Sequence, residues 1–393
     1  MAHITDLDGV YAAALASGIK PNKLDLGYIF VPGAVASAGV FTQNKVAAPC
    51  VVFNKKNNDR HIVKAVVVNA GNANAATGEQ GAKDVKKTAA LAAEKLGLLP
   101  SEVAVASTGI IGVPLPMDKV EAGLNTLLKT PKVRHGDVLA KAIMTTDLCV
   151  KEVFVQKKIG KKNIVVAGMA KGSGMIAPNM ATMLGFLVTN ANLDHAHLQE
   201  ALSHAVNRSF NMISVDTDTS TNDMVLIQAT GERQFSVQDK AEWQAFLDLL
   251  TEACTHLAKL IAKDGEGATK LIEVTVNQAA SVKDAKRLAL SIVNSPLVKT
   301  AIHGADPNWG RVMAAAGKVE EAKLNPAKAT LHFGEVLVFE KGAPTAFDVK
   351  ALRTMLSGDT VQITLNLNLG KSAATAWGCD LTKGYIDINT QYS

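Results

Sequence analysis

Apolar residues recur at two spacings along this chain, and each spacing predicts one kind of element. A spacing of three to four residues gives a single apolar face and predicts helices, whereas runs of β-branched residues or strict alternation predict strands. Helices are predicted at residues 82–96, 119–128, 239–261 and near 284–293, with a further helix that Asp194 can cap. The longest, 239–261, carries one continuous apolar stripe and is expected to face a core.

Strands are predicted between these helices. They cover residues 64–68, 103–106, 183–188, 272–276, 330–338, 361–369 and 384–388, with a hairpin whose arms are 153–156 and 163–169, and short strands joined by tight turns within 28–52. Strand 361–369 alternates apolar and polar residues, which indicates a sheet with one solvent-facing side. Because hairpins and helices are interleaved, we expect an α+β fold with mixed α/β layers rather than a doubly wound parallel sheet.

The length of 393 residues favours more than one domain. The pattern of predicted helices and strands changes near residues 277–283. We therefore predict a larger N-terminal α/β domain of residues 1–280, which contains most of the candidate site, and a smaller C-terminal α/β domain of residues 281–393.

Composition narrows the class of protein. Apolar residues make up 48% of the chain and charged residues 20%, a balance typical of a folded protein with an ample core. The net charge of +5 comes from scattered lysines, which argues against nucleic-acid binding. No stretch has the uninterrupted apolar length of a membrane span. The four cysteines show no metal-ligand spacing and the start resembles no signal peptide, so reduced thiols and a cytoplasmic location are expected.

The stretch from Ala170 to Asn190, AKGSGMIAPNMATMLGFLVTN, is the strongest candidate for chemistry. Its small residues allow the backbone to approach a ligand closely, and the loop leads to Thr182 at the start of an apolar strand. A nucleotide-binding loop is disfavoured because Lys171 precedes the glycines instead of following them. On residue types alone, an ordinary turn fits as well as a nucleophile at Thr182.

Three other loops carry polar residues of interest. Thr108 and Gly109, expected in a turn after a short strand, offer a hydroxyl and an N–H side by side, as an oxyanion requires. Glu266 lies among glycines and could bind an ammonium group. The run DTDTSTND, Asp216 to Asp223, suggests calcium, but it lacks the glycine and terminal glutamate of an EF-hand loop. Each loop also fits a purely structural role.

The sequences of several segments, in order along the whole chain, resemble those of the ArgJ family of glutamate N-acetyltransferases, also called ornithine acetyltransferases. The matching segments are KGSGMIAPNMATML around Thr182, VVNAGNANAATGEQG (Val67 to Gly81), STGIIG (Ser107 to Gly112), MTTD (Met144 to Asp147), DTDTSTND, DGEGATK (Asp264 to Lys270), HGADPNWGR (His303 to Arg311) and the tail YIDINTQYS. The resemblance implies the DmpA/ArgJ-like fold and an acyltransferase.

The resemblance also implies that the precursor cleaves itself between Ala181 and Thr182, giving an α chain of residues 1–181 and a β chain of 182–393. Thr182 is then the nucleophile, and Thr108 and Gly109 form the oxyanion hole. The freed α-amino group of Thr182 can act as the base, because its reference pKa of about 7.7 to 8.0 leaves part of it uncharged at neutral pH.

The substrate-binding residues that the resemblance implies are Thr145, Lys171, Thr182, Glu266, Asn389 and Ser393. Lys171 suits a carboxylate and Glu266 an ammonium group. Ser393 departs from the family pattern, because the family has its terminal Ser or Thr five positions after the asparagine and this chain ends after four.

The reaction implied is ping-pong transfer of an acetyl group from N2-acetylornithine to glutamate in cyclic arginine biosynthesis, with ornithine released. No cofactor and no metal are expected, although some family members also use acetyl-CoA as a co-substrate. The family suggests a heterotetramer of two α and two β chains. Two alternatives stay open: a self-cleaving N-terminal-threonine amidase or aminopeptidase that passes the acyl group to water, and a non-enzymatic small-molecule binding protein.

Overall fold

The computed structural model describes residues 2–59, 62–177 and 183–390. The chain forms two compact units. Unit 1 comprises the described residues of Met1–Gly172, Asn179–Asn207 and Thr219–Leu257, and unit 2 those of Ser173–Pro178, Arg208–Asp218 and Ala258–Ser393. Two short segments from the middle of the chain therefore belong to the C-terminal unit.

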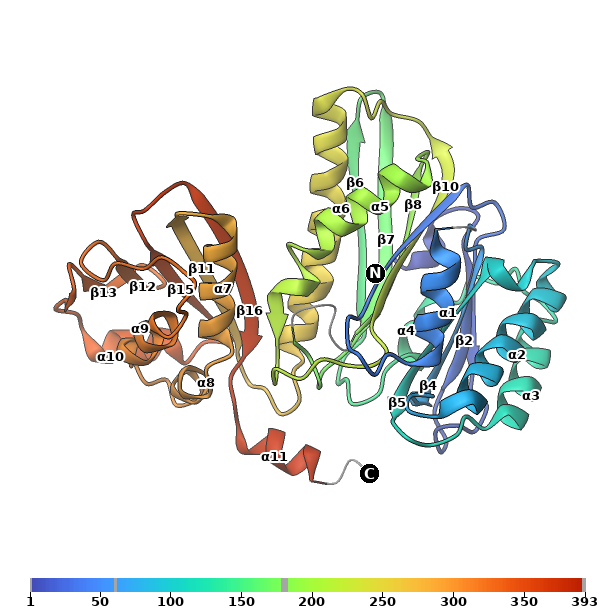
Figure 1. Cartoon of the computed structure of the whole chain (residues 1–393), viewed down its shortest axis with the longest axis horizontal. Helices are drawn as coiled ribbons and strands as arrows, with labels where there is room; N and C mark the ends of the chain where they lie inside the picture. Colours follow the sequence, from blue (N-terminus) through green and yellow to red (C-terminus); the bar gives the residue numbers. More distant parts are fainter. Residues whose placement is uncertain (1, 60–61, 178–182, 391–393) are drawn as a thin grey trace. The chain divides into compact units, whose positions relative to one another are not determined.

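Unit 1 contains two sheets (Figure 1). The four-stranded sheet has the order β1 (Tyr11–Leu15), β2 (Leu26–Phe30), β4 (Ala65–Asn72) and β5 (Val103–Ile110), and the five-stranded sheet has the order β3 (Ala36–Phe41), β10 (Met224–Arg233), β8 (Leu184–Ala191), β7 (Lys162–Lys171) and β6 (Lys151–Ile159). The pairs β4/β5 and β8/β10 are parallel, and the other neighbours are antiparallel.

The helices of unit 1 are α1 (Pro49–Asn58), α2 (Gly78–Leu96), α3 (Met117–Leu127), α4 (Gly136–Ala142), α5 (His195–Val206) and α6 (Lys240–Lys263), with short 3-10 helices η1 (Ile4–Asp6) and η2 (Pro100–Glu102); the last turns of α6, from Ala258, belong to unit 2. One hydrophobic cluster joins the two sheets, with Val66 and Val68 from β4, Phe186 from β8 and Leu226 from β10 among its members. Small and branched aliphatic residues dominate this core, as the low aromatic content of 5% requires.

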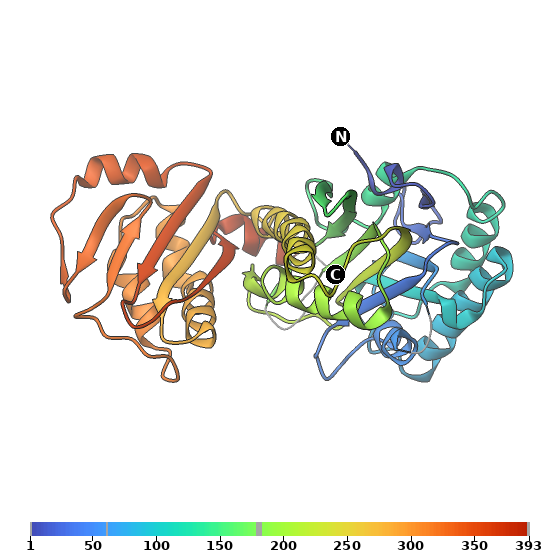
Figure 2. The same ribbon diagram turned by 90° about the horizontal axis from the view of Figure 1, so that it is seen from above.

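Unit 2 is built on one mixed sheet of seven strands. Their order is β14 (Ala343–Pro344), β13 (Val336–Glu340), β12 (Thr330–Phe333), β15 (Thr360–Asn366), β11 (Leu271–Ala279), β16 (Ser372–Cys379) and β9 (Ile213–Ser214), and the helices are η3 (Phe210–Met212), α7 (Val282–Val293), α8 (Pro296–His303), α9 (Trp309–Gly317), α10 (Val349–Leu356) and α11 (Lys383–Asn389). Helix α7 packs against β11 and β16, and Figure 2 shows the strands of this sheet side by side. Among the residues that the structure describes, no helix has the length and apolar character to cross a membrane.

The α+β class and the strongly periodic helices are confirmed. Helices α2 and α7 cover the segments predicted for them, α3 and α6 each cover theirs except for one end residue, and the predicted hairpin is β6 with β7. Asp194 caps α5 as expected, because its carboxylate accepts the His197 N–H at 2.9 Å.

The division of the chain differs from the predicted boundary near residues 277–283. Strand β11 lies inside the seven-stranded sheet, paired in parallel with β15 and antiparallel with β16. Unit 2 therefore already includes the chain from Ala258 onward.

Three element predictions were wrong. Residues 384–388 lie in helix α11 instead of a strand, residues 330–338 form the hairpin of β12 and β13 with a turn at Gly334, and the second half of 28–52 includes the start of helix α1. Gly334 has φ +53°, a backbone conformation that glycine adopts easily, which explains the break in the expected single strand.

We expect Leu288→Ala to lower the free energy of unfolding by about 2 to 5 kcal/mol, because this side chain is fully buried in α7. Urea titration followed by circular dichroism would measure the loss. Val282→Ala in the same helix, 51% exposed, is the matched control and should change stability by less than about 0.5 kcal/mol. Equal losses in the two variants would contradict the packing of α7.

Candidate active site

The side chain of Lys171 is the centre of the candidate site in unit 1. Lys171 is the last residue of β7, which lies between β6 and β8. Its ammonium group is buried, with 4% of the side chain exposed. It donates to the hydroxyl oxygens of Thr145 at 2.8 Å and Thr108 at 3.3 Å. Three residues predicted from separate segments are therefore in direct contact.

A carboxylate that was not predicted, Asp147, balances the charge of Lys171. Its Oδ2 lies 4.0 Å from Lys171 Nζ and accepts the Thr145 N–H at 3.0 Å. Its Oδ1 accepts from Lys151 Nζ at 2.7 Å and from the Gly172 N–H at 2.6 Å. Burial by itself raises the pKa of Asp147, but Lys171 and Lys151 outweigh it and hold this pKa well below its usual value. Lys171 and Lys151 are therefore both held against the Asp147 carboxylate.

Thr108 is positioned to donate its hydroxyl hydrogen to a ligand. A lysine ammonium has no acceptor, so the contact with Lys171 uses the Thr108 oxygen and leaves its O–H hydrogen to be donated elsewhere. Thr108 and Gly109 lie near the end of strand β5, so the turn predicted for them was wrong.

Gly109 is restricted to glycine by two features of the structure. Its φ of +134° disfavours any L side chain. A Cβ at this position would also collide with the backbone of Gly71, the residue paired with Gly109 across β4 and β5. The backbones of the two strands therefore approach closely at the predicted oxyanion hole.

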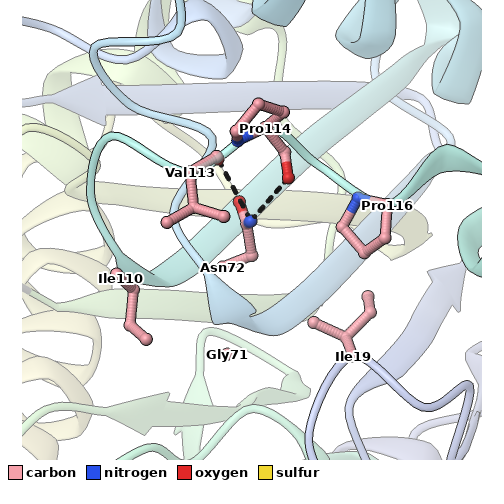
Figure 3. Close-up of a pocket in the computed structure, with 7 residues that line it drawn as sticks. All are labelled: Ile19, Gly71, Asn72, Ile110, Val113, Pro114 and Pro116. Carbon is pink, nitrogen blue, oxygen red and sulfur yellow. Dashed lines mark hydrogen bonds between the residues drawn. The ribbon is translucent and has the colours of Figure 1, made fainter. Parts of the chain in front are cut away.

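A cavity of about 250 Å³ lies beside Gly71, the residue paired with Gly109 (Figure 3). It is lined mainly by apolar residues, namely Ile19, Gly71, Asn72, Ile110, Val113, Pro114 and Pro116. The Asn72 side chain donates to the carbonyl oxygens of Val113 and Pro114, both at 3.1 Å, and so fixes the loop that forms one wall. The cavity can hold a small apolar group next to Gly71.

Lys20 is a second residue that the sequence did not single out. Its ammonium group donates to the carbonyl oxygens of Ala142 at 3.1 Å and Met144 at 2.8 Å, which fixes the segment leading to Thr145. Burial is the main reason that the pKa of Lys20 falls to about 8, although the Asp25 carboxylate opposes the shift. No motif or spacing in the sequence marks this role.

Lys20 also lines a second cavity, of about 330 Å³. The other lining residues are Lys23, Leu24, Lys141, Met144, Thr145, Asp147, Leu148 and Val150. The cavity reaches Thr145, so a ligand bound there would meet the same hydroxyl that Lys171 contacts.

Two predicted substrate-binding residues meet in unit 2. The Asn389 side-chain amide, on α11, donates to Glu266 Oε2 at 2.9 Å. Glu266 is 7% exposed, and its main-chain N–H donates to the Ser173 carbonyl at 2.8 Å. Its carboxylate lies against Gly174, where a Cβ would collide with it. The expectation that Glu266 lies in a loop is confirmed, and its carboxylate is held by contacts instead of being free in solvent.

Three predicted residues, Ala181, Thr182 and Ser393, lie outside the described residues. Within the part of the chain that the structure describes, no group of three or more His, Cys, Asp or Glu residues is arranged to hold a metal ion. In the run considered for calcium, the carboxylates of Asp216 and Asp223 accept hydrogen bonds from main-chain N–H groups.

Comparison with known proteins covers almost the whole chain. The ArgJ family model matches residues 11–393. The chain is 47% identical over 394 residues to the arginine biosynthesis bifunctional protein ArgJ of Symbiobacterium thermophilum, which covers 99% of this chain and 98% of that protein. It is 44% identical over 387 residues to the protein of the same name from Bacillus cereus, covering 98% and 95%.

A solved structure agrees with the sequence comparison. The crystal structure of arginine biosynthesis bifunctional protein ArgJ from Bacillus halodurans matches with a TM-score of 0.52 and 46% identity, covering 54% of this chain and 100% of that chain. Because the family model and the full-length relatives both extend over nearly all of these residues, this chain belongs to the ArgJ family.

Proposed function

We propose that this chain is a bifunctional acetyltransferase of arginine biosynthesis that transfers an acetyl group from N2-acetylornithine to glutamate. Its full-length relatives are named as bifunctional proteins of that pathway. The observation that carries the proposal is the buried Lys171 ammonium between the hydroxyl groups of Thr108 and Thr145. This arrangement supplies both a cation for a substrate carboxylate and an oriented donor for an oxyanion.

The first stage is self-cleavage. The Thr182 hydroxyl oxygen attacks the carbonyl carbon of Ala181, the C–N bond breaks as the nitrogen gains a proton, and an ester forms. Water then hydrolyses the ester to the Ala181 carboxylate and a free Thr182 hydroxyl.

The second stage is acetyl transfer. The Thr182 amine takes the hydroxyl proton, and the oxygen attacks the acetyl carbonyl of N2-acetylornithine. The Thr108 O–H and Gly109 N–H donate to the oxyanion, and ornithine leaves as the amine, carrying the proton. The glutamate amine then attacks the acetyl-Thr182 ester, and the threonine hydroxyl is restored with its proton. The acetyl group stays activated throughout, so neither a cofactor nor ATP is needed.

Recognition of the amino-acid parts falls to charged and polar side chains. Lys171 and Thr145 bind a substrate carboxylate, and Glu266 binds an ammonium group. A carboxylate offers about four acceptor positions, so the hydrogen bond from Asn389 leaves Glu266 with capacity for a substrate. Asn389 and the terminal Ser393 complete this part of the site.

The proposal extends to assembly and location. We expect a heterotetramer of two α and two β chains in the cytoplasm, with acetyl-CoA as a second acetyl donor. The alternative, an N-terminal-threonine amidase, differs only in the acceptor. Comparing the rates of acetyl transfer to glutamate and to water decides between the two functions.

The first prediction concerns cleavage. Intact-mass measurement of the purified protein should show two fragments, Met1–Ala181 and Thr182–Ser393, because the Thr182 hydroxyl is the attacking group. Thr182→Ala should give one uncut chain, whereas the control Thr126→Ala, at an exposed helical position, should be cut. A folded, unmutated chain that stays whole would remove the self-cleaving threonine from the mechanism.

The second prediction concerns Lys171. In fully cleaved protein, Lys171→Ala should reduce kcat/KM for N2-acetylornithine by a factor equivalent to about 2 to 5 kcal/mol, because a buried charged donor is lost. Steady-state transfer to glutamate would measure it. Lys162→Ala, exposed at the other end of the same strand, is the control. Similar kinetics for the two variants would exclude Lys171 from the site.

The third prediction concerns pH. The Thr182 amine must be neutral to act as a base. We therefore expect kcat/KM to increase as the pH is raised through about 7.7 to 8.0, and to be low at more acidic pH, where the amine is protonated. Lys20 loses its proton in the same range, since its pKa is about 8. Measuring the pH profile of Lys20→Met separates the two groups, because this variant should keep the acidic limb. A shifted acidic limb in Lys20→Met would assign the titration to Lys20 instead.

A further inference from the structure

Two asparagine side chains bind the outer side of strand β5. This strand is the last of the four-stranded sheet, so within the described chain one side of it lacks a partner strand. Asn54 donates to the Val105 carbonyl at 2.8 Å and accepts the Val105 N–H at 3.1 Å. Asn222 donates to the Ser107 carbonyl at 2.9 Å. Both asparagines are buried, with 4% and 5% of each residue exposed.

The next main-chain donor after Ser107 on this side belongs to Gly109. Successive peptide groups of a strand direct their N–H and C=O groups to opposite sides. Val105, Ser107 and Gly109 are two residues apart along β5, so the Gly109 N–H faces the side that the two asparagines bind. The proposed function assigns this N–H to the oxyanion.

The side-chain amide of Asn222 joins β5 to the chain that follows β4. It donates to the Ala73 carbonyl at 2.6 Å as well as to Ser107, so both of its N–H bonds are used. Since both acceptors are carbonyl oxygens, the amide nitrogen must face them. The amide oxygen accepts the Thr221 hydroxyl at 2.6 Å. Every polar atom of the Asn222 side chain therefore has a partner.

These bonds enclose the two residues of the predicted oxyanion hole. Ser107, which directly precedes Thr108, is held through its carbonyl. Ile110, which directly follows Gly109, accepts the Ala73 N–H at 3.0 Å. Ala73 is thus bound at its N–H by the residue after the pair, and at its carbonyl by the same amide that binds the residue before it.

The main chain that carries Asn222 is itself fixed within unit 1. The Asn222 N–H donates to the Ser220 hydroxyl at 3.1 Å. The Ser220 carbonyl accepts the Thr42 hydroxyl at 2.8 Å, and the Thr221 carbonyl accepts the Ala48 N–H at 2.8 Å. A side chain with such a support can hold β5 in one position.

We propose that Asn222 is a positioning residue for acetyl transfer, which fixes β5 so that the Thr108 hydroxyl and the Gly109 N–H converge on the oxyanion. This inference rests on the proposed function, because it assumes that these two groups are the oxyanion donors. Such donors lower the barrier only where they meet the developing charge, which requires their positions to be held within about 0.5 Å. Asn222 acts through β5 and not on the substrate.

The first test is steady-state transfer from N2-acetylornithine to glutamate by fully cleaved enzyme. Asn222→Ala should lower kcat by roughly 10- to 100-fold, less than the loss of one donor outright. KM should change little, because the two donors act on the transition state.

Asn54→Ala is the matched control for this test. It removes an asparagine of similar burial from the same side of β5, bound to a residue further from Gly109. This variant should keep kcat close to that of the unmutated enzyme. An equal fall in kcat in the two variants would show a general loosening of β5 and would overturn the proposal. Unchanged kcat in Asn222→Ala would overturn it as well.

A double-mutant cycle with Thr108 gives a readout that a purely structural role would not change. Thr108→Val removes one of the two donors that Asn222 positions. Asn222→Ala should therefore lower kcat several-fold less in the Thr108→Val background than in the unmutated enzyme. Equal fold losses in the two backgrounds would show that Asn222 acts independently of the oxyanion donors, against the proposal.

Hydrogen exchange replaces kinetics if Asn222→Ala does not cleave. In uncut Thr182→Ala chains, mass spectrometry should show faster exchange of the amides of residues 107–110 when Asn222→Ala is added than when Asn54→Ala is added. This difference is expected because only Asn222 binds Ser107 and Ala73. Equal exchange in the two double variants would contradict the positioning role.

The proposed function and this inference fail in different ways. If the unmutated chain transfers no acetyl group from N2-acetylornithine to glutamate, the proposed function is wrong. If it does, and Asn222→Ala has the kinetics of the unmutated enzyme, only the positioning role is wrong.

Discussion

The buried ammonium group of Lys171 is the constraint on which the candidate site depends. A charge in a protein interior is costly unless it is paired and hydrogen-bonded. Lys171 meets this requirement with Asp147 and with the hydroxyl groups of Thr108 and Thr145, which come from different segments of unit 1. To satisfy this requirement, strand β5, the end of β7 and the segment after α4 must lie close together. Since buried ion pairs seldom add net stability, a functional reason for this arrangement is the simpler explanation.

Much of the fold could be predicted from hydrophobic spacing, and the failures have identifiable causes. Helix α6 and the β6/β7 hairpin have long, regular patterns that match their environment. Helix α1 was missed because its pattern is reversed: Asn54 is buried and Val52 is 59% exposed. The Asn54 side chain exchanges hydrogen bonds with the N–H and C=O of Val105 on the edge strand β5. The Asn54 side chain thus binds main-chain groups that a neighbouring strand would otherwise pair with. The spacing of hydrophobic residues in the sequence does not reveal such a role.

Helix α11 failed for a different reason. The alternation in residues 384–388 resembles a strand, but Ile386 is 61% exposed and no residue of the helix is buried. The spacing of apolar residues predicts the type of element only where one face of that element is buried against the rest of the protein.

The site residues were found mainly by resemblance, and their partners only by structure. Thr108, Lys171 and Glu266 lie in segments that match family wording, whereas the hydrogen bonds between Lys171, Thr108 and Thr145 join segments far apart in the sequence. Asp147 was part of a matched segment but received no role, because its importance comes from two lysines that fold onto it. Lys20 offered no signal, since its contacts are with main-chain carbonyl groups that every sequence contains.

The exposure of α11 has a practical consequence for work with this protein. The helix lies at the end of the described chain, and polar contacts such as Asn389 with Glu266, Tyr385 with Asp216 and Thr382 with the Gly267 carbonyl tie it to unit 2. An affinity tag fused after Ser393 would follow a helix in which no residue is buried. Such a tag would disturb the contacts that hold Asn389. Expression vectors for this enzyme should therefore carry the tag at the amino terminus.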